Sequence, residues 1–196
     1  MNIWITTDLH FKKSQFEFLV ENQDKYDILT INGDLLNQRI DFEKQTKWIN
    51  SLFRKIKKPV FICSGNHDLD AEMEFNWLYG DNLILDNKIK TINGIKFGVV
   101  PFMGADFSKF YDCDILLYHI PPKNTKTATL KTGMDLGCDE VYQALKHKII
   151  KPKYLLCGHL HTTLSKEDTI NQTKIINPNA KPNAQDPLVY ELNIKG

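Results

Sequence analysis

Five short clusters of histidine, aspartate and asparagine carry side chains of the kind that bind divalent metals. In chain order the clusters are Asp8-Leu9-His10, Gly33-Asp34, Gly65-Asn66-His67-Asp68, Tyr118-His119 and Gly158-His159-Leu160-His161. Imidazole and carboxylate ligands together suit manganese, iron, zinc, cobalt or nickel. Five of the six histidines belong to these clusters, and only His147 stands apart, in a lysine-rich segment. The pattern therefore predicts metal-dependent chemistry.

Each cluster follows an apolar run that is typical of a β-strand. In the first half we expect strands at 2–7, 27–31 and 60–63, and helices that begin near Ser14 and Asp41. Glu17, three residues after Ser14, would complete a capping box. Alternating strands and helices indicate parallel neighbours joined by right-handed crossovers. Ligands of such sheets bind beyond the carboxyl ends of the strands, so we expect the clusters to meet at one edge.

The second half of the chain predicts a hairpin and a long loop. Asn93-Gly94 separates apolar runs at 83–92 and 95–100, and this dipeptide is a strong signal for a two-residue hairpin turn. The remaining expected elements are strands at 114–118 and 153–157, a loop at 120–137, a helix at 139–149, and a tail in which 173–176 pairs with 188–194. The whole pattern predicts an α/β (α+β) fold of two packed mixed β-sheets flanked by helices.

The composition is that of a globular protein without a large excess of charge. Its 25 Lys and Arg residues oppose 24 Asp and Glu residues, and the net charge of +1 argues against a nucleic-acid binder. No apolar run approaches the roughly 18 residues of a membrane span, and we see no signal peptide. We therefore expect a cytoplasmic protein with no membrane contact. We also expect a single domain over residues 1–196 with no separate cap, and four reduced cysteines.

The clusters, taken in order, resemble the motifs of the calcineurin-like metallophosphoesterases. Asp-x-His, Gly-Asp, Gly-Asn-His-Asp, His and Gly-His-x-His extend from Asp8 to His161. Segments 118–122, 136–138, 151–152 and 176–179 resemble a smaller subgroup, the brain-type metallophosphoesterase-domain proteins, which is similar to cyclic-nucleotide phosphodiesterases. The resemblance implies the calcineurin-like metallophosphoesterase sandwich and a phosphoester-hydrolysing activity.

The resemblance also implies a centre of two divalent metals, with manganese expected and iron, zinc, nickel or cobalt as alternatives. Six side chains are divided between the two ions: Asp8, His10 and His161 for the first, and Asn66, His119 and His159 for the second. Asp34 would bridge the ions, because one carboxylate can offer an oxygen to each of two cations about 3.5–4 Å apart.

Two further residues have implied roles in catalysis. His67 would donate a proton to the leaving-group oxygen, since imidazole titrates near neutral pH. Asp68 would hold the His67 ring in the required tautomer. Asn37 departs from the pattern, because many family members have aspartate at this position, and we expect at most an effect on substrate contacts or charge balance there.

Several functions remain open at this point. A phosphodiesterase acting on a small nucleotide-type phosphoester is favoured, with a phosphomonoesterase, such as a protein or nucleotide phosphatase, as the alternative. A non-catalytic scaffold of the same fold is disfavoured because the ligand set is complete. Four aromatic residues could either line a base-binding pocket or pack in the core: Phe102, Phe107, Phe110 and Tyr111. The sequence sets no oligomeric state.

Overall fold

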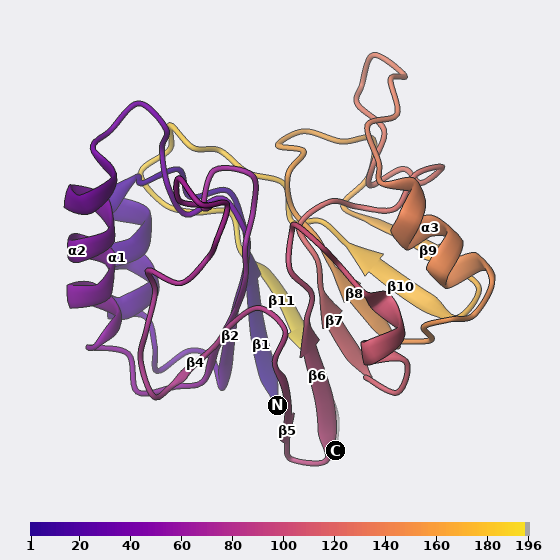
Figure 1. Ribbon diagram of the computed structural model, residues 1–196, viewed down its shortest axis with the longest axis horizontal. Coiled ribbons are helices and arrows are strands. Elements are labelled where there is room, and N and C mark those ends of the chain that lie inside the picture. The colour runs from indigo at the N-terminus through magenta and orange to yellow at the C-terminus, as the bar shows by residue number, and fades with distance from the viewer. Residues whose placement is uncertain (195–196) are drawn as a thin grey trace.

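The computed structural model describes residues 1–194 and contains two β-sheets packed face to face (Figure 1). The strands of the first sheet, in spatial order, are β11 (Tyr190–Asn193), β1 (Asn2–Thr6), β2 (Ile28–Asn32), β3 (Val60–Cys63) and β4 (Leu83–Ile84). Strands β1 to β4 are parallel, and β11 is antiparallel to β1. The predicted alternation of strands and helices thus produces a sheet with parallel neighbours.

The second sheet is also mixed. Its strands, in spatial order, are β5 (Ile89–Ile92), β6 (Ile95–Val99), β7 (Ile115–Leu117), β8 (Tyr154–Leu156), β10 (Thr173–Ile176) and β9 (Glu167–Ile170). The four central strands, β6, β7, β8 and β10, run parallel, whereas β5 and β9 are antiparallel edges. The prediction of two packed mixed sheets is confirmed.

The predicted hairpin joins β5 to β6. Ile92 pairs with Ile95, and the two turn residues have positive φ angles of 50° at Asn93 and 78° at Gly94. Such a turn needs positive φ at both central positions, which asparagine and glycine adopt at low cost. The local sequence therefore decides this element.

Apolar side chains between the sheets form the central core. Ile3, Ile5, Val99 and Leu117 are fully buried in it, and the rings of Phe61 and Phe97 stack with their centroids 4.5 Å apart. Strands covered on both faces are expected to be almost continuously apolar. The parallel strands show this pattern, and their packing fixes the two sheets relative to each other.

Helices cover the outer faces. Helices α1 (Lys13–Glu21) and α2 (Phe42–Phe53) lie on the first sheet, and α3 (Asp139–Lys146) with the 3₁₀ helix η1 (Phe107–Phe110) lies on the second (Figure 1). Asp41 caps α2 as predicted, its Oδ1 accepting from the backbone N–H of Lys44 at 2.8 Å. No helix of residues 1–194 is both long enough and apolar enough to cross a lipid bilayer.

The expected capping box at the start of α1 is wrong. Lys12 occupies the N-cap position, and no side chain caps the helix in the described structure. The Ser14 hydroxyl instead donates to the backbone carbonyl of Gln185 at 2.7 Å. The hydroxyl therefore bonds to a segment more than 160 residues away and does not cap the helix.

The expected pairing of the tail is also wrong. Segment 173–176 pairs with β8 and β9, while β11 crosses to the first sheet and pairs with β1. The run 83–92 is likewise divided, since β4 joins the first sheet and β5 the second. Local apolar patterns predicted that strands exist here, but long-range pairing decided their partners.

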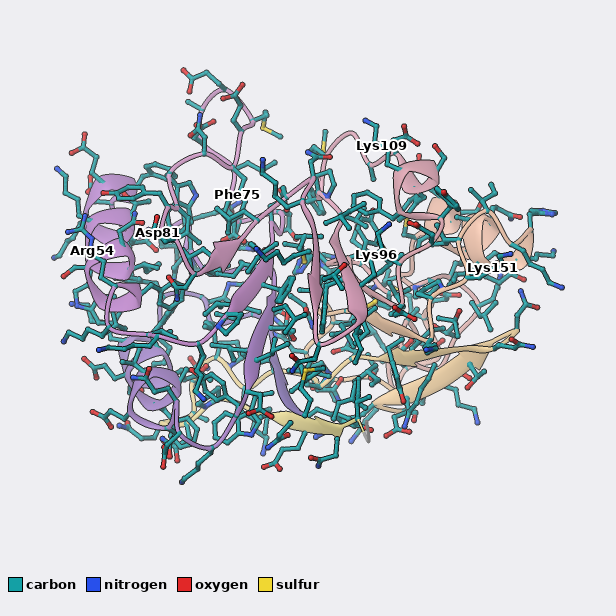
Figure 2. The ribbon with its side chains drawn as sticks, turned by 90° about the horizontal axis from the view of Figure 1, so that it is seen from below. Arg54, Phe75, Asp81, Lys96, Lys109 and Lys151 are labelled. Carbon is teal, nitrogen blue, oxygen red and sulfur yellow. The ribbon has the colours of Figure 1, made fainter. Side chains whose placement is uncertain are left out.

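Cationic side chains lie on both halves of the molecule. Figure 2 shows Arg54 beside the helices of the first sheet and Lys96, Lys109 and Lys151 on the side of the second. Some are paired with acids, as in the 3.1 Å contact between Lys153 Nζ and Asp114 Oδ1. This distribution agrees with the near-zero net charge of the sequence.

Candidate metal centre

The polar clusters meet at one edge of the sandwich. Asp8, Asp34 and Asn66 follow the carboxyl ends of β1, β2 and β3, while His119 and His159 follow β7 and β8. The first three come from one sheet and the last two from the other. The centre therefore lies where the two sheets adjoin, as expected for ligands beyond the ends of parallel strands.

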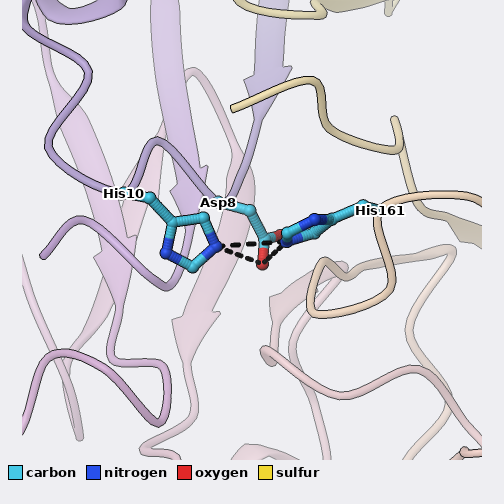
Figure 3. A group of neighbouring side chains, drawn as sticks. All are labelled: Asp8, His10 and His161. Carbon is cyan, nitrogen blue, oxygen red and sulfur yellow. Dashed lines mark hydrogen bonds and ion pairs between the residues drawn. The ribbon is translucent and has the colours of Figure 1, made fainter. Parts of the chain in front are cut away.

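One group consists of Asp8, His10 and His161, whose ligand atoms lie within 4.8 Å of one another (Figure 3). The two Nε2 atoms are 3.1 Å apart, and Asp8 Oδ1 lies 3.3 Å from His161 Nε2 and 3.8 Å from His10 Nε2. Ligand atoms that share one cation at about 2.1 Å are separated by about 3.0–3.4 Å. Two of the three separations therefore have the spacing of a metal site, and the one between Asp8 and His10 is wider.

A second group consists of Asp34, His119 and His159, again within 4.8 Å. Asp34 Oδ1 lies 3.4 Å from His119 Nε2, and the rings of His119 and His159 are 5.0 Å apart between centroids. The side-chain oxygen of Asn66 is buried and has no hydrogen-bond partner within residues 1–194. Both sequence neighbours of Asn66, Gly65 and His67, contact Asp34. Because buried polar atoms without partners are costly, the orphaned Asn66 oxygen fits a fourth ligand of this group.

Asp34 connects the two groups. Its Oδ1 faces His119, whereas its Oδ2 faces His10 Nε2 at 3.9 Å. Burial opposes its charged form, but the His119 ring and a 2.9 Å hydrogen bond from the backbone N–H of His67 outweigh burial and lower the pKa of the carboxyl. Asp34 is therefore an anion with one oxygen toward each group, as a bridging ligand requires.

The tautomer of His119 is fixed by the backbone. Its Nδ1 lies 2.6 Å from the carbonyl oxygen of Asn32, and a carbonyl can only accept, so Nδ1 carries a hydrogen. Nε2 is buried and points toward Asp34. Burial lowers the pKa of His119, but the Asp34 carboxylate more than offsets it and raises the pKa to about 9. In the neutral ring, with its hydrogen on Nδ1, Nε2 is therefore the nitrogen that can coordinate a metal.

Burial acts differently on two other ligands. It is the largest influence on His10 and His159 and lowers the pKa of each. A histidine must be neutral to bind a metal. Desolvation therefore keeps both rings in the form that coordinates.

Four ligand residues have left-handed backbone conformations. The φ angles are 53° at Asp8, 43° at His10, 57° at Asp34 and 67° at His159. Such angles cost of order 1–3 kcal/mol each in residues other than glycine, and they concentrate at functional sites. The backbone is therefore strained at all four residues. This strain supports a functional role for their side chains, which the unusual φ angles orient toward the centre.

Two motif glycines allow the loops to approach closely. A Cβ atom at Gly33 would collide with the His119 ring, and one at Gly65 would collide with Asp34. Gly33 also has a φ of 90°. Both motifs therefore need glycine for the ligand loops to pack against each other.

His67 lies at the open side of the centre. Its Nε2 is 3.8 Å from Asp34 Oδ2, its ring meets that of His10 edge to face, and 28% of its side chain is exposed. It also belongs to a possible ligand group with His10 and Asp34. The geometry thus places His67 where it can reach a substrate or an ion.

The predicted contact between Asp68 and the His67 ring is wrong. Asp68 is fully buried, and its Oδ1 accepts from the backbone N–H groups of Leu35 and Leu36 at 2.7 and 3.0 Å. Its Oδ2 accepts from the N–H of Gly65 at 2.9 Å. His67 Nδ1 is buried without a partner in the described chain. Asp68 therefore ties the Gly-Asp loop to the Gly-Asn-His loop, because unpaired loop amides attract a buried carboxylate more directly than the ring does.

Sequence reasoning missed the role of Asn177. This fully buried side chain donates from Nδ2 to the carbonyls of Gly158 and Leu160, each at 3.1 Å, and accepts from the N–H of Asn179. It therefore holds the loop that carries His159 and His161. The available signal was the Asn-Pro-Asn segment directly after an apolar strand.

The four aromatic residues separate into different roles. Phe107 and Phe110 are buried in the core of the second sheet, as the packing alternative predicts, and Tyr111 is exposed. Phe102 alone of these four packs edge to face on His119, with 5.9 Å between ring centroids.

The side-chain oxygen of Asn37 accepts from the backbone N–H of Arg39 at 3.0 Å in a surface turn. Asn37 thus stabilises local structure, and the exposed His147 ends α3.

Comparison with known proteins identifies this combination of fold and site. Residues 1–163 match the family model for calcineurin-like phosphoesterases, which confirms the resemblance of the motifs. A symmetrical bis(5'-nucleosyl)-tetraphosphatase of Buchnera aphidicola is 36% identical over 73 residues, which are 36% of this chain and 25% of that protein. The match thus spans about a quarter of that relative.

Solved structures share the fold. The protein TT1561 of Thermus thermophilus has a TM-score of 0.68 at 13% identity, with 99% of both chains covered. An archaeal phosphodiesterase has a TM-score of 0.54 at 16% identity, covering 91% of this chain and 84% of that chain. Purple acid phosphatase PPD1 of yellow lupin has a TM-score of 0.58 at 13% identity, covering all of this chain and 46% of its own.

Proposed function

The chain belongs to the calcineurin-like phosphoesterase family, and on that premise we propose that it hydrolyses a nucleotide-type phosphodiester at a dinuclear metal centre. The observation that carries the proposal is the position of Asp34, with one carboxylate oxygen toward each of two groups of ligands. Seven side chains would hold the ions: Asp8, His10, Asp34, Asn66, His119, His159 and His161.

Different residues of the chain would bind the ions and transfer the proton. Two divalent cations, when bound, supply the positive charge that stabilises a phosphate as its bond to the leaving group breaks. Asp34 would fix their separation, and the neutral rings of His10 and His159 would orient toward them. His67, partly exposed beside Asp34, would donate a proton to the leaving oxygen. Its orientation would come from packing against His10 rather than from Asp68.

Manganese is the metal that we propose in vitro, with iron, zinc, nickel and cobalt as alternatives that the same carboxylate, amide and imidazole ligands also suit. We propose a small substrate rather than a nucleic acid, since the net charge is +1. A cytoplasmic location is supported by the four cysteines, which are free in the described structure. We also propose that residues 1–196 form a single domain, because the two sheets share one apolar core.

The preference for a nucleotide diester rests on the named relatives. The Buchnera protein is a bis(5'-nucleosyl)-tetraphosphatase, and a neighbour of the same fold is an archaeal phosphodiesterase. Phosphomonoester hydrolysis is the second candidate, because the same fold occurs in a purple acid phosphatase.

A substrate panel tests the proposal. The protein is treated with a chelator and assayed with manganese against an aryl phosphodiester, the matching monoester, cyclic nucleotides and dinucleoside tetraphosphates. We expect no turnover without metal and faster turnover of diesters than of the monoester. Faster monoester hydrolysis would favour a phosphatase, and indifference to the chelator would contradict a metal centre.

A further inference from the structure

A half-buried carboxylate outside all of the metal-binding motifs is bonded to the Gly-Asn-His loop. Asp86 lies between β4 and β5, on the connection that leaves the first sheet for the second. Its Oδ1 accepts from the backbone N–H of Ser64 at 2.9 Å, and its Oδ2 accepts from the Ser64 hydroxyl at 2.6 Å. Two hydrogen bonds to one residue fix both the backbone and the side chain of Ser64.

Ser64 connects Asp86 to strand ends of both sheets. It directly precedes Gly65-Asn66-His67 at the end of β3, and it is fully buried. Its hydroxyl oxygen accepts from the backbone N–H of Phe102 at 3.0 Å, in the loop after β6. The hydroxyl has one hydrogen, which it gives to Asp86, so its lone pairs are free to accept from Phe102. Asp86 and Ser64 thus join the end of β3 to the end of β6.

Asn66, which follows Ser64 in sequence, and Phe102, which bonds to Ser64, both belong to one half of the metal centre or pack against it. Asn66, two residues after Ser64, presents its unpartnered side-chain oxygen, and the Phe102 ring packs on His119. Asn66 and His119 belong to the same proposed ion, whereas Asp8, His10 and His161 belong to the other. The constraint is therefore directed to one ion.

The residues around Asp86 leave Ser64 as the main partner of its carboxylate. Asp86 and Ser64 line a surface cavity with Met73, Met103 and Glu74, so no cationic side chain among its lining residues competes for the carboxylate. Hydrogen bonds to a charged acceptor are stronger where the surrounding protein partly excludes water. The two bonds to Ser64 are thus the main interactions that hold this carboxylate.

We infer that Asp86 is a positioning residue for the second metal ion, acting through Ser64 on Asn66 and through Phe102 on His119. The inference rests on the proposed dinuclear centre. It predicts that loss of the Asp86 carboxylate weakens binding of one ion and leaves the other ion bound. A carboxylate needed only for folding would not separate the two ions in this way.

Manganese binding to the metal-free, full-length protein tests the inference. Titration by calorimetry, with electron paramagnetic resonance to distinguish paired from single manganese ions, is applied to the wild type, Asp86→Ala and Asp24→Ala. Asp24 is an exposed acid after α1 and serves as the matched control. For Asp86→Ala we expect one site with wild-type affinity and one weakened roughly tenfold or more, the scale for losing an outer partner of a metal ligand. Asp24→Ala should bind as the wild type does.

Two milder variants cover the case in which Asp86→Ala does not fold. Asp86→Asn keeps an acceptor for the Ser64 N–H and should recover much of the lost affinity. Ser64→Ala keeps that N–H but breaks the link to Phe102, and should weaken the same ion. If all variants bind two ions as the wild type does, the inference about Asp86 is overturned while the metal centre stands. If the wild type itself does not bind two ions, the proposed centre fails and the inference fails with it.

Discussion

The two halves of the metal centre differ in how much the protein encloses them. In the half formed by Asp34, His119 and His159, the His119 side chain is completely buried and that of Asp34 is 3% exposed. In the half formed by Asp8, His10 and His161, the side chains of His10 and His161 are 14% and 41% exposed. Each half has one deeply buried carboxylate and one half-buried histidine, so the difference lies in the third ligand: His119 is enclosed, whereas His161 is open to solvent.

The two halves differ in what they contribute: one to the stability of the fold, the other to the access of substrate. Burying an ionisable group is costly unless it is paired, and Asp34 and His119 satisfy that requirement for each other even without a cation. His161 is exposed enough that water solvates it in the metal-free protein. The enclosed half is therefore part of the fold, and the open half is the side from which a phosphoester can approach.

Substitution of Asp34, which joins the halves, should have the largest effect. Asp34→Ala removes the oxygens that face both groups and leaves His119 buried without its partner. We expect loss of both metal ions and of all measurable turnover, determined by elemental analysis and by the diester assay. Retention of two ions per chain would contradict a bridging role.

The next largest effect is expected at His67, on the open side. His67→Ala should lower the rate constant by about 10²–10⁴-fold, the usual value of general acid–base catalysis. Both ions should remain bound, which elemental analysis would establish. Loss of an ion together with the rate would instead make His67 a ligand, since its Nε2 also lies near Asp34 and His10.

Matched substitutions of His119 and His161 compare the halves directly. In the metal-free protein, His119→Ala should destabilise the fold by about 1–3 kcal/mol, because it leaves the buried Asp34 carboxylate unpaired. His161→Ala should destabilise the fold less, because water can reach the place of a ring that is 41% exposed and Asp8 keeps its hydrogen bond from the His159 N–H. Urea denaturation measures both. Equal losses of stability would remove the distinction between the halves.

A smaller effect is expected from Asn177, which holds the loop that carries His159 of the enclosed half and His161 of the open half. Asn177→Ala leaves the carbonyls of Gly158 and Leu160 without their shared donor. Loss of such supporting contacts typically costs roughly 10–100-fold in metal affinity. Manganese titration should show weaker binding with the fold retained, and Asn179→Ala is a neighbouring comparison. Unchanged affinity would show that the loop holds its shape without Asn177.

The smallest expected effect concerns pH. Burial raises the pKa of Asp86 to about 6 from its ordinary 3.8, with hydrogen bonds from Ser64 opposing the shift. A raised pKa means that the folded state holds the proton more tightly, so this contribution to stability is present below about pH 4 and is lost as pH rises to about 6. Relative to Asp86→Asn, metal-free wild type should therefore lose stability across this window. Parallel curves for the two proteins would contradict the shift.

Much of the site could be predicted because its residues follow strands that the sequence marks clearly. Asp8 and Asp34 follow adjacent parallel strands, which end at the same edge of one sheet, and His119 follows a parallel strand of the second sheet. The hairpin at Asn93-Gly94 and the cap at Asp41 were predicted for a similar reason, since each depends on residues within a few positions.

The errors share an opposite cause. The tail pairs with β1 across almost the entire chain, and Ser14 bonds to Gln185, so no local pattern could indicate either partner. Asp68 follows His67 in sequence, yet its carboxylate turns to the amides of Leu35, Leu36 and Gly65. Proximity along the chain was a poor guide where buried amides from another loop needed an acceptor.

The sequence by itself determined which chemical groups end the strands, the family to which the chain belongs and the class of ion that those groups suit. Only the tertiary structure decided which half of the centre is enclosed, which loops Asp68 and Asn177 hold, and how Asp86 links the two sheets. The physical reason is range: ligand type and strand propensity are properties of a few adjacent residues, whereas burial and hydrogen-bond partners depend on what the rest of the fold brings to the same place.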